Sequence, residues 1–251
     1  MNIIAIVQAR MTSTRLPGKT MRILSGKPLL QHVVDNLKKS KNIDKLVVAT
    51  TTDSEDDIID LWCKKNSIFS YRGDREDVLS RFYECALKYK ADAIVRVTSD
   101  CPLIDSIIVD SVIDLFKTTN SDYATNSLIK SFPHGLDIEI FSFDALRESF
   151  ENTKKQNDRE HVTQYIRSRP EKFKLTNFLS SGDYSGVYSS IRVTIDEDED
   201  FELVELIINK LGNDINLKDL LKLYQEDPDL FNINKGAKSR HKEYYEKQNI
   251  I

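Results

Sequence analysis

The sequence has few of the features that mark secreted, membrane-spanning or nucleic-acid-binding proteins. Its 251 residues include only three cysteines, an odd number without the paired spacing of a metal site. No apolar run is long enough to cross a bilayer, and Met1 leads into a short apolar segment without a signal region. A formal charge of −4 gives no general attraction to nucleic acid or anionic lipid. We therefore expect a cytoplasmic protein with no nucleic-acid partner and no membrane association.

The composition is that of an ordinary globular protein. Hydrophobic residues make up 40% of the chain and charged residues 30%, and the length suits one large domain with a small extension. From residue 232 onward the sequence is mostly polar. We predict one domain over residues 1–231 and a polar C-terminal tail over residues 232–251.

Strand and helix patterns alternate through the first half of the chain. Short apolar runs at 3–7, 45–50, 68–72 and 93–98 each end in a polar loop that leads to an amphipathic helix or turn. This succession predicts an α/β fold with a mainly parallel sheet covered on both faces. Ligands of such sheets bind beyond the carboxyl ends of the strands, where these polar loops would meet.

The second half of the chain is less regular. Residues 136–140 alternate as a strand should, and residues 191–195 form a last apolar run that predicts a strand. Residues 157–166 predict a single helix. A polar loop contains Tyr184, Gly186 and Tyr188, and either a cover for an acceptor or a plain surface loop would explain it. In the first half, His32 is expected on the surface, beside the apolar face of its helix.

The first strand leads into a loop rich in cationic and hydroxyl side chains. The loop contains two arginines, a lysine, a serine and a threonine around a Pro-Gly turn: Arg10, Ser13, Thr14, Arg15 and Lys19. Guanidinium forks, an ammonium and hydroxyl donors together suit the many acceptor oxygens of a polyphosphate. Lys19 is followed by Thr20, as in the usual P-loop, but the loop has only Gly18 where that motif needs two glycines. A solvated surface loop would have the same composition.

Two aspartates follow predicted strands and are candidates for a metal site. Asp100 follows the run at 93–98, and Asp196 follows the run at 191–195. Mg²⁺ bound to a triphosphate is typically held by one or two carboxylates together with the phosphates. Helix capping at Asp100 and helix-dipole compensation at Asp196 are the structural alternatives. Asp198 and Asp200 are further candidate ligands.

Two loops resemble the signature loops of the cytidylyltransferases that activate acidic sugars, including the acylneuraminate, pseudaminate, legionaminate and ketodeoxyoctulosonate enzymes. They are Ala9-Arg10 with Ser13-Thr14-Arg15-Leu16-Pro17-Gly18-Lys19, and Ser99-Asp100-Cys101-Pro102-Leu103. Three further stretches are similar to the branch called spore coat polysaccharide biosynthesis protein F: Gly73 to Leu79, Gly135 to Glu139, and Arg159 to Thr163. The resemblance covers about residues 3 to 210.

The resemblance implies a fold, an activity and a set of site residues. The fold would be a GT-A-like, Rossmann-like nucleotidyltransferase, a three-layer α/β sandwich with a mainly parallel mixed sheet. The reaction would couple CTP to a sugar acid, giving CMP-sugar and pyrophosphate for surface polysaccharide or glycan biosynthesis. The resemblance implies catalytic roles for Arg10, Arg15 and Lys19, magnesium at Asp100 and Asp196, and nucleotide binding by Gln8, Ala9, Arg10, Ser13, Thr14, Lys19, Arg72, Gly73, Asp74, Ser99 and Asp100. Asp137, Glu139, Glu160 and His161 would contact the sugar.

The expected chemistry is an in-line attack of an acceptor oxygen on the α-phosphorus of CTP, with Mg²⁺ and the cationic side chains neutralising the developing charge. A metal-bound water, a nearby carboxylate or His161 could take the proton of the acceptor. By resemblance we also expect a homodimer, paired through the segment that follows the strand near residues 136–140.

Three alternative functions are consistent with the sequence. A GT-A glycosyltransferase would use a nucleotide-sugar and a metal-binding Asp-X-Asp, for which Asp196-Glu197-Asp198 has the spacing. A polyol phosphate or another small phosphate could replace the sugar acid as acceptor. A nucleotide-binding protein without catalysis is the third alternative, because fold alone does not determine function.

Overall fold

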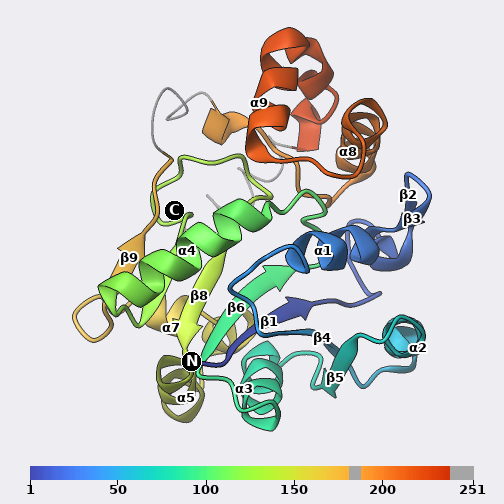
Figure 1. The fold of residues 1–251 in the computed structure, drawn as a ribbon. Helices are drawn as coiled ribbons and strands as arrows, with labels where there is room; N and C mark the ends of the chain where they lie inside the picture. The colour runs from blue at the N-terminus through green and yellow to red at the C-terminus, as the bar shows by residue number, and fades with distance from the viewer. Residues whose placement is uncertain (181–187, 238–251) are drawn as a thin grey trace.

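The computed structural model describes residues 1–180 and 188–237, and its centre is a seven-stranded sheet (Figure 1). The strands lie in the order β5-β4-β1-β6-β8-β7-β9. Only β8 runs antiparallel to its neighbours in this sheet. The strands are β1 (Ile3–Gln8), β4 (Lys45–Thr51), β5 (Phe69–Gly73), β6 (Ala93–Thr98), β7 (Tyr123–Thr125), β8 (Glu139–Ser142) and β9 (Leu175–Asn177), and β2 (Ile23–Leu24) pairs with β3 (Lys27–Pro28) in a separate hairpin.

Helices cover both faces of the sheet, which confirms the predicted α/β sandwich (Figure 1). Buried residues on one face come from α1 (Leu29–Leu37), α2 (Asp57–Lys65), α4 (Ser106–Thr119), α8 (Asp198–Leu211) and α9 (Leu217–Glu226). Buried residues on the other face come from α3 (Val78–Lys88), α5 (Phe143–Asn152) and α7 (Gln164–Arg167). The remaining described elements are α6 (Gln156–Glu160) and the short 3-10 helices η1 (Lys19–Met21), η2 (Ser54–Asp56), η3 (Tyr188–Ser190) and η4 (Pro228–Asn232).

The apolar run of β1 is explained by burial on both faces. Ile3, Ala5 and Val7 belong to one hydrophobic cluster, whereas Ile4 and Ile6 belong to the other. Successive side chains of a strand point to opposite faces, so a central parallel strand needs apolar residues throughout. The apolar pattern stops at the carboxyl ends of the strands, where polar side chains follow. These polar residues form the candidate site.

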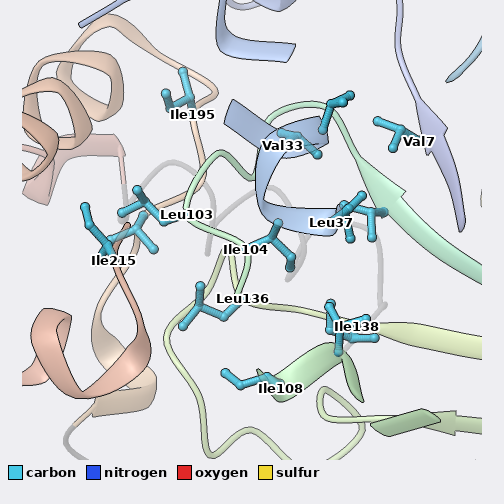
Figure 2. Packing of buried hydrophobic residues seen from close by; sticks show 14 of the residues in the cluster. Val7, Val33, Leu37, Leu103, Ile104, Ile108, Leu136, Ile138, Ile195 and Ile215 are labelled. Atoms are coloured by element: carbon cyan, nitrogen blue, oxygen red, sulfur yellow. The ribbon is translucent and has the colours of Figure 1, made fainter. Parts of the chain in front are cut away.

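The larger hydrophobic cluster joins distant parts of the chain (Figure 2). Val33 and Leu37 of α1 lie in the same cluster as Val7 of β1, and Ile195 and Ile215 add side chains from the last third of the chain. Burial of this size stabilises the fold chiefly through the hydrophobic effect. It also holds the segment around residue 195 against the first half of the chain.

Several local predictions differ from the structure. The predicted helix over 157–166 is two short helices, α6 and α7, because Val162 between them has φ of 51°, which no α-helix contains. The predicted strand at 191–195 forms only an isolated bridge between His134 and Arg192. His32 is buried rather than exposed, and its Nε2 lies 2.8 Å from the carbonyl oxygen of Leu24.

The C-terminal part of the described chain packs on the domain. Asn234 and Ala237 have no exposed surface, although both lie beyond the predicted boundary at residue 231. That boundary stays a prediction. Residues 238–251 of the predicted tail lie outside the described residues, as do Tyr184 and Gly186. Every helix within residues 1–180 and 188–237 falls short of the length and apolar character that crossing a bilayer requires.

Candidate active site

Lys19 joins the three segments that form the centre of the site. Its Nζ lies 2.9 Å from Asp100 Oδ2, 2.9 Å from Asp196 Oδ1 and 2.6 Å from the carbonyl oxygen of Ile195. Arg15 Nη2 also lies 2.9 Å from Asp196 Oδ1. Four residues that the sequence singles out, in three separate loops, therefore meet at the carboxyl end of the sheet.

These groups hold one another in their charged forms. Burial disfavours the ammonium form of Lys19. The charges and hydrogen bonds of Asp100 and Asp196 together outweigh this effect of burial and raise the pKa of Lys19. Burial likewise disfavours both carboxylates, and Lys19 outweighs it and lowers the pKa of Asp100 and of Asp196. Thr98 Oγ1 donates to Asp100 Oδ1 at 2.5 Å and lowers the pKa of Asp100 further. The cluster is therefore fully ionised at neutral pH.

The two carboxylates fit a divalent cation bound together with a nucleotide. Asp100 and Asp196 already place one oxygen each at 2.9 Å from the same cationic atom, so both reach one cation position. Within the described part of the chain, no group of three or more His, Cys, Asp or Glu residues could hold a metal alone. Mg²⁺ commonly takes one or two protein carboxylates and completes its shell with phosphate oxygens and water. The donor set therefore suits Mg²⁺ delivered with a triphosphate.

The other acidic residues near Asp196 have separate partners. Asp198 pairs with Arg22 at 2.6 Å and has a mostly exposed side chain. Asp200 is fully buried and accepts hydrogen bonds from Arg192 Nε at 3.0 Å and Nη2 at 3.1 Å. Glu197 and Asp200 also form the capping box of α8. Neither Asp198 nor Asp200 therefore shares the cation position between Asp100 and Asp196.

Backbone hydrogen bonds fix the shape of the first loop. The amide of Gly18 donates to the carbonyl of Met11 at 2.8 Å, and the amide of Met11 donates to Asp56 Oδ1 at 2.7 Å. Thr20 Oγ1 donates to the carbonyl of Arg10 at 2.9 Å. Gly18 has φ of 74°, a left-handed conformation that glycine adopts without steric cost. The loop is held from β1 to η1 while the side chains of Ser13 and Thr14 stay accessible.

Arg10 lies beside a second, buried arginine that the sequence analysis missed. Arg81 of α3 has no exposed surface, and burial followed by the charge of Arg10 lowers its pKa to about 10. Arg81 Nη1 donates to the carbonyl of Asp74 at 2.9 Å. Among the described residues, Arg10 forms no ion pair. Two neighbouring guanidinium groups create a positive potential that favours an anion next to Arg10.

The loop after β5 is shaped by its own polar side chains. Arg72 donates from Nε to the carbonyl of Thr51 and from Nη2 to that of Asp53, both at 2.8 Å, and so joins two of the predicted loops. Asp74 Oδ1 accepts from the amides of Glu76 and Asp77, each at 2.8 Å. Arg72 and Asp74 therefore shape this loop, and the nucleotide contacts that we predicted for both remain predictions.

Gly73 is required by close packing. A Cβ atom at this position would lie 3.0 Å from Cγ of Arg81 and 3.2 Å from Cε1 of Tyr71. Its carbonyl also accepts from the amide of Thr52 at 3.1 Å. Gly73 therefore lets α3 approach the end of β5 and brings Arg81 under the loop.

The polar ends of β1, β6 and β8 share one face of the sheet. Arg96 Nη1 lies 2.5 Å from Glu139 Oε2, and Arg96 Nη2 lies 3.3 Å from Gln8 Oε1. The other oxygen of Glu139 accepts from Tyr123 at 2.7 Å and from Thr163 at 2.6 Å. Burial disfavours ionised Glu139, but the charges of Arg96 and Arg167 together with the hydrogen bonds from Thr163 and Tyr123 lower the pKa of Glu139. Because both oxygens of Glu139 are already bonded, its contacts favour a positioning role over direct sugar binding.

His161 lies next to this network, at the turn between α6 and α7. Thr163, which bonds Glu139, donates its amide to the carbonyl of His161 across Val162. Burial is the main cause that lowers the pKa of His161, and the charges of Arg96 and Arg167 lower it further. The imidazole is therefore neutral near pH 7. Glu160, the fourth predicted sugar contact, is exposed at the end of α6.

Asp137 is held by a tight turn that precedes β8. It accepts from the amide of Gly135 at 3.0 Å, and its Oδ2 lies 3.2 Å from Nδ1 of His134. Gly135 has φ of 111°, and a Cβ atom there would lie 2.6 Å from the amide nitrogen of Thr194. Only glycine fits this close approach, which places Asp137 beside the segment that leads to Asp196.

The structure thus brings about half of the predicted site residues into two neighbouring groups. The first is the cation position around Lys19, Asp100 and Asp196. Ser99 precedes Asp100 in the chain, and its amide donates a hydrogen bond to the carbonyl of Gln8 at 2.9 Å. Ala9 is buried and donates to the carbonyl of Ala49 at 3.1 Å. The second group surrounds Glu139. Sequence reasoning missed Arg81, Arg96 and Arg192, although a charged residue inside an apolar run was a usable signal for the last two.

Comparison with known proteins agrees with this geometry. The sequence model of the family described as "Cytidylyltransferase" matches residues 4–237. The spore coat polysaccharide biosynthesis protein SpsF of Bacillus subtilis is 34% identical over 235 residues, which cover 91% of this chain and 96% of that protein. The 3-deoxy-manno-octulosonate cytidylyltransferase of Pelobacter propionicus is 34% identical over 116 residues, 45% of this chain and 44% of that protein.

Solved structures show the same relationship. A cytidylyltransferase from Leptospira borgpetersenii has a TM-score of 0.86 at 35% identity, covering 92% of this chain and 97% of that one. The resemblance to cytidylyltransferases that the sequence motifs indicated is confirmed, as is its link to the spore coat branch. The protein described here therefore belongs to the cytidylyltransferase family.

Proposed function

We propose that this protein couples CTP to a sugar acid of the sialic, legionaminic, pseudaminic or ketodeoxyoctulosonic type, releasing pyrophosphate. The observation that supports this most strongly is the convergence of Asp100, Asp196 and Lys19 at one cation position. Arg15 is bonded to the same cluster and Arg10 lies nearby without an ion pair among the described residues. A triphosphate needs this combination of a divalent-ion site and flexible cations.

In the proposed reaction, a hydroxyl oxygen of the acceptor attacks the α-phosphorus of CTP. A new oxygen–phosphorus bond forms, the bond between the α-phosphorus and the bridging oxygen breaks, and pyrophosphate leaves with its electron pair. Arg10, Arg15 and Lys19 bind the triphosphate and stabilise the charge that develops on it. Mg²⁺, when held by Asp100 and Asp196, supplies further neutralisation of that charge. His161 can take the acceptor's proton because burial keeps its imidazole neutral near pH 7.

The charges near Glu139 favour an anionic acceptor. The positive charges of Arg96 and Arg167 both act on Glu139 and on His161. These guanidinium groups can bind a carboxylate on the substrate, while Glu139 and Glu160 offset part of their charge. A phosphate on a small polyol would satisfy the same charges, so a polyol phosphate is the second candidate acceptor.

The glycosyltransferase alternative has less support. Its Asp-X-Asp would be Asp196-Glu197-Asp198, but Asp198 pairs with Arg22 away from the cation position. A non-catalytic nucleotide-binding role would not require two carboxylates and a lysine at one point. We also propose that the protein is a cytoplasmic homodimer that takes part in surface polysaccharide or glycan biosynthesis, and light scattering of the purified protein tests the dimer.

The test is pyrophosphate release with Mg²⁺. CTP, UTP, ATP and GTP are offered in turn with nonulosonic acids, ketodeoxyoctulosonate and polyol phosphates, and Asp100→Ala is the inactive control. We expect release only with CTP and an acidic sugar, reduced about a hundredfold or more in the variant. Release with a polyol phosphate alone would favour the second acceptor. Binding of CTP with no release for any acceptor would contradict the proposal.

A further inference from the structure

A buried asparagine near the C-terminus is connected to the candidate metal ligand Asp196. Asn234 lies directly after η4 and has no exposed surface. Its Nδ2 donates to the carbonyl of Arg192 at 3.0 Å and to Asp200 Oδ1 at 2.8 Å. Because both partners are acceptors, only one orientation of the amide satisfies them.

Asp200 connects Asn234 to the site through its other hydrogen bonds. Besides Asn234, it accepts from Arg192 Nε at 3.0 Å and Nη2 at 3.1 Å, and from the amide nitrogens of Asp196 at 3.0 Å and Glu197 at 3.1 Å. Asp200 therefore holds both the backbone at Asp196 and the guanidinium next to it. Asp200 and Arg192 are each almost completely buried, so water does not replace these bonds.

Arg192 completes the connection to the reacting end of Asp196. Arg192 Nη2 donates to Asp196 Oδ2 at 2.6 Å, while the other oxygen of that carboxylate faces Lys19 and Arg15. Fixing Oδ2 orients Oδ1 toward the cation position. Partners behind a metal ligand commonly orient it in this way.

We propose that Asn234 is a positioning residue for the nucleotidyl transfer, acting through Asp200 and Arg192 on the carboxylate of Asp196. This inference rests on the proposed function. Every charged group of the cation position lies before the end of α9. Asn234, which lies after it, gives Asp200 a further hydrogen-bond donor that carries no charge. An aspartate of the same shape would lack the two donated hydrogens and would repel Asp200.

The alternative is that Asn234 only fills space beneath α8. Two variants separate the two explanations. Asn234→Ala removes both the donors and the volume, whereas Asn234→Asp keeps the volume and removes the donors. A space-filling role predicts that both variants, where folded, bind CTP and metal like the wild type, and that the repulsion between the new carboxylate and Asp200 lowers only stability. The positioning role predicts that metal-dependent binding is impaired in both variants.

A matched control lies two residues away. Asn232 is exposed at the end of η4, and its side-chain amide donates to Asp229 Oδ1 at 3.2 Å. Asn232→Ala therefore makes the same chemical change in the same segment without touching Arg192 or Asp200.

The experiment measures the affinity of the full-length proteins for CTP by calorimetry, once with Mn²⁺ and once with a chelator. We expect Asn234→Ala and Asn234→Asp to weaken binding in the presence of Mn²⁺ by about 10- to 100-fold. Binding without metal should change far less, because Arg10 and the hydrogen bonds that shape the first loop do not involve Asp196. Asn232→Ala should match the wild type in both conditions. Thermal unfolding of each variant shows whether it remains folded at the assay temperature.

The outcomes test the two proposals separately. If the wild-type protein binds no CTP with or without Mn²⁺, the proposed function is wrong. If the wild type binds CTP with Mn²⁺ and folded Asn234 variants bind equally well, the positioning role is wrong and the proposed function stands. A steady-state comparison adds a second criterion: the positioning role predicts a lower kcat at saturating Mg²⁺ and CTP, whereas a purely structural role leaves kcat per folded molecule unchanged.

Discussion

The ammonium of Lys19 lies 2.9 Å from Oδ1 of Asp196 and equally far from Oδ2 of Asp100, which is the position a divalent cation would take between the two carboxylates. A lysine and a metal ion cannot both occupy that point. If the proposed metal binds between these carboxylates, Lys19 has to move away from that point, and the phosphates of the nucleotide would be its new partner. Lys19 would then serve in turn as counter-ion of the free site and as ligand of the triphosphate.

Replacing Lys19 should separate metal binding from catalysis. Lys19→Met removes the ammonium between the two carboxylates, so Mn²⁺ alone should bind about tenfold tighter or more. Turnover should fall about a hundredfold or more, because a charged contact to the triphosphate is lost. Electron paramagnetic resonance of free Mn²⁺ and a pyrophosphate assay measure the two effects. Lys27→Met, which breaks the 2.6 Å pair with Asp35, is the control, and unchanged Mn²⁺ binding in Lys19→Met would contradict the shared position.

Removing Arg192 should destabilise the fold strongly. Arg192 is buried between Asp196 and Asp200, so Arg192→Met leaves two buried carboxylates short of their partner. Breaking such a pair costs about 3–5 kcal/mol in the free energy of unfolding. Arg147→Met removes an exposed arginine that pairs with Asp144 at 2.8 Å, and should cost less than about 1 kcal/mol. Urea unfolding measures the free energy of unfolding of both variants. Similar decreases in the two would contradict the claim that the buried ion pairs of Arg192 matter more than an exposed one.

The stability that ionised Asp196 contributes to the fold should be lost in acid. Burial disfavours ionised Asp196, but Lys19 outweighs it, so the folded pKa lies below the unfolded value of about 3.9. A group with a lowered folded pKa adds stability above its unfolded pKa, and that stability is lost as the pH falls. Asp196→Asn should therefore be less stable than the wild type at pH 7, with a gap that narrows below about pH 4. Chemical unfolding from pH 7 to pH 3 measures the gap, and a constant gap would count against this linkage.

Replacing Glu139 should weaken binding of the acceptor more than binding of the nucleotide. Glu139→Gln removes the charge that holds Arg96 and weakens the link to Thr163 beside His161. Loss of a hydrogen bond to a charged group is worth about 1.5–3 kcal/mol, so KM for the acceptor should rise about 10- to 100-fold with little change in KM for CTP. Glu84→Gln is the matched control because Glu84 accepts from Tyr71 at 2.6 Å on the surface. Equal changes in both KM values would argue against a separate acceptor side.

The sequence was sufficient for the parallel strands β1, β4, β5 and β6 and for the centre of the site, whereas no pattern in it predicted β7 or β9. Apolar runs alternating with amphipathic helices predicted the parallel strands, and polar loops at the strand ends predicted that Lys19 and Asp100 would meet. Asp196 was found because it follows an apolar run, even though residues 191–195 make one bridge rather than a strand. That run gains its hydrogen bonds from loops, as when the amide of Ile195 donates to the carbonyl of Asp100 at 2.8 Å.

Contacts between distant segments could not be predicted in the same way. Arg192 was included in a strand pattern, and nothing local shows that Asp200 would neutralise it. Asn234 belongs to a stretch that composition marks as a polar tail, but its burial depends on the fold of residues 192–200. The break at Val162 is a left-handed residue in an otherwise helical pattern, and a β-branched side chain gives no warning of it.

The central claim is best tested by following CTP and an acidic sugar with ³¹P NMR in the presence of Mg²⁺ and the purified protein. We predict that the three resonances of CTP are replaced by pyrophosphate and by one phosphodiester, the CMP-sugar, and that Asp196→Ala abolishes the change. Intact CTP with every sugar acid, or CMP and pyrophosphate formed without any sugar phosphodiester, would contradict the assignment.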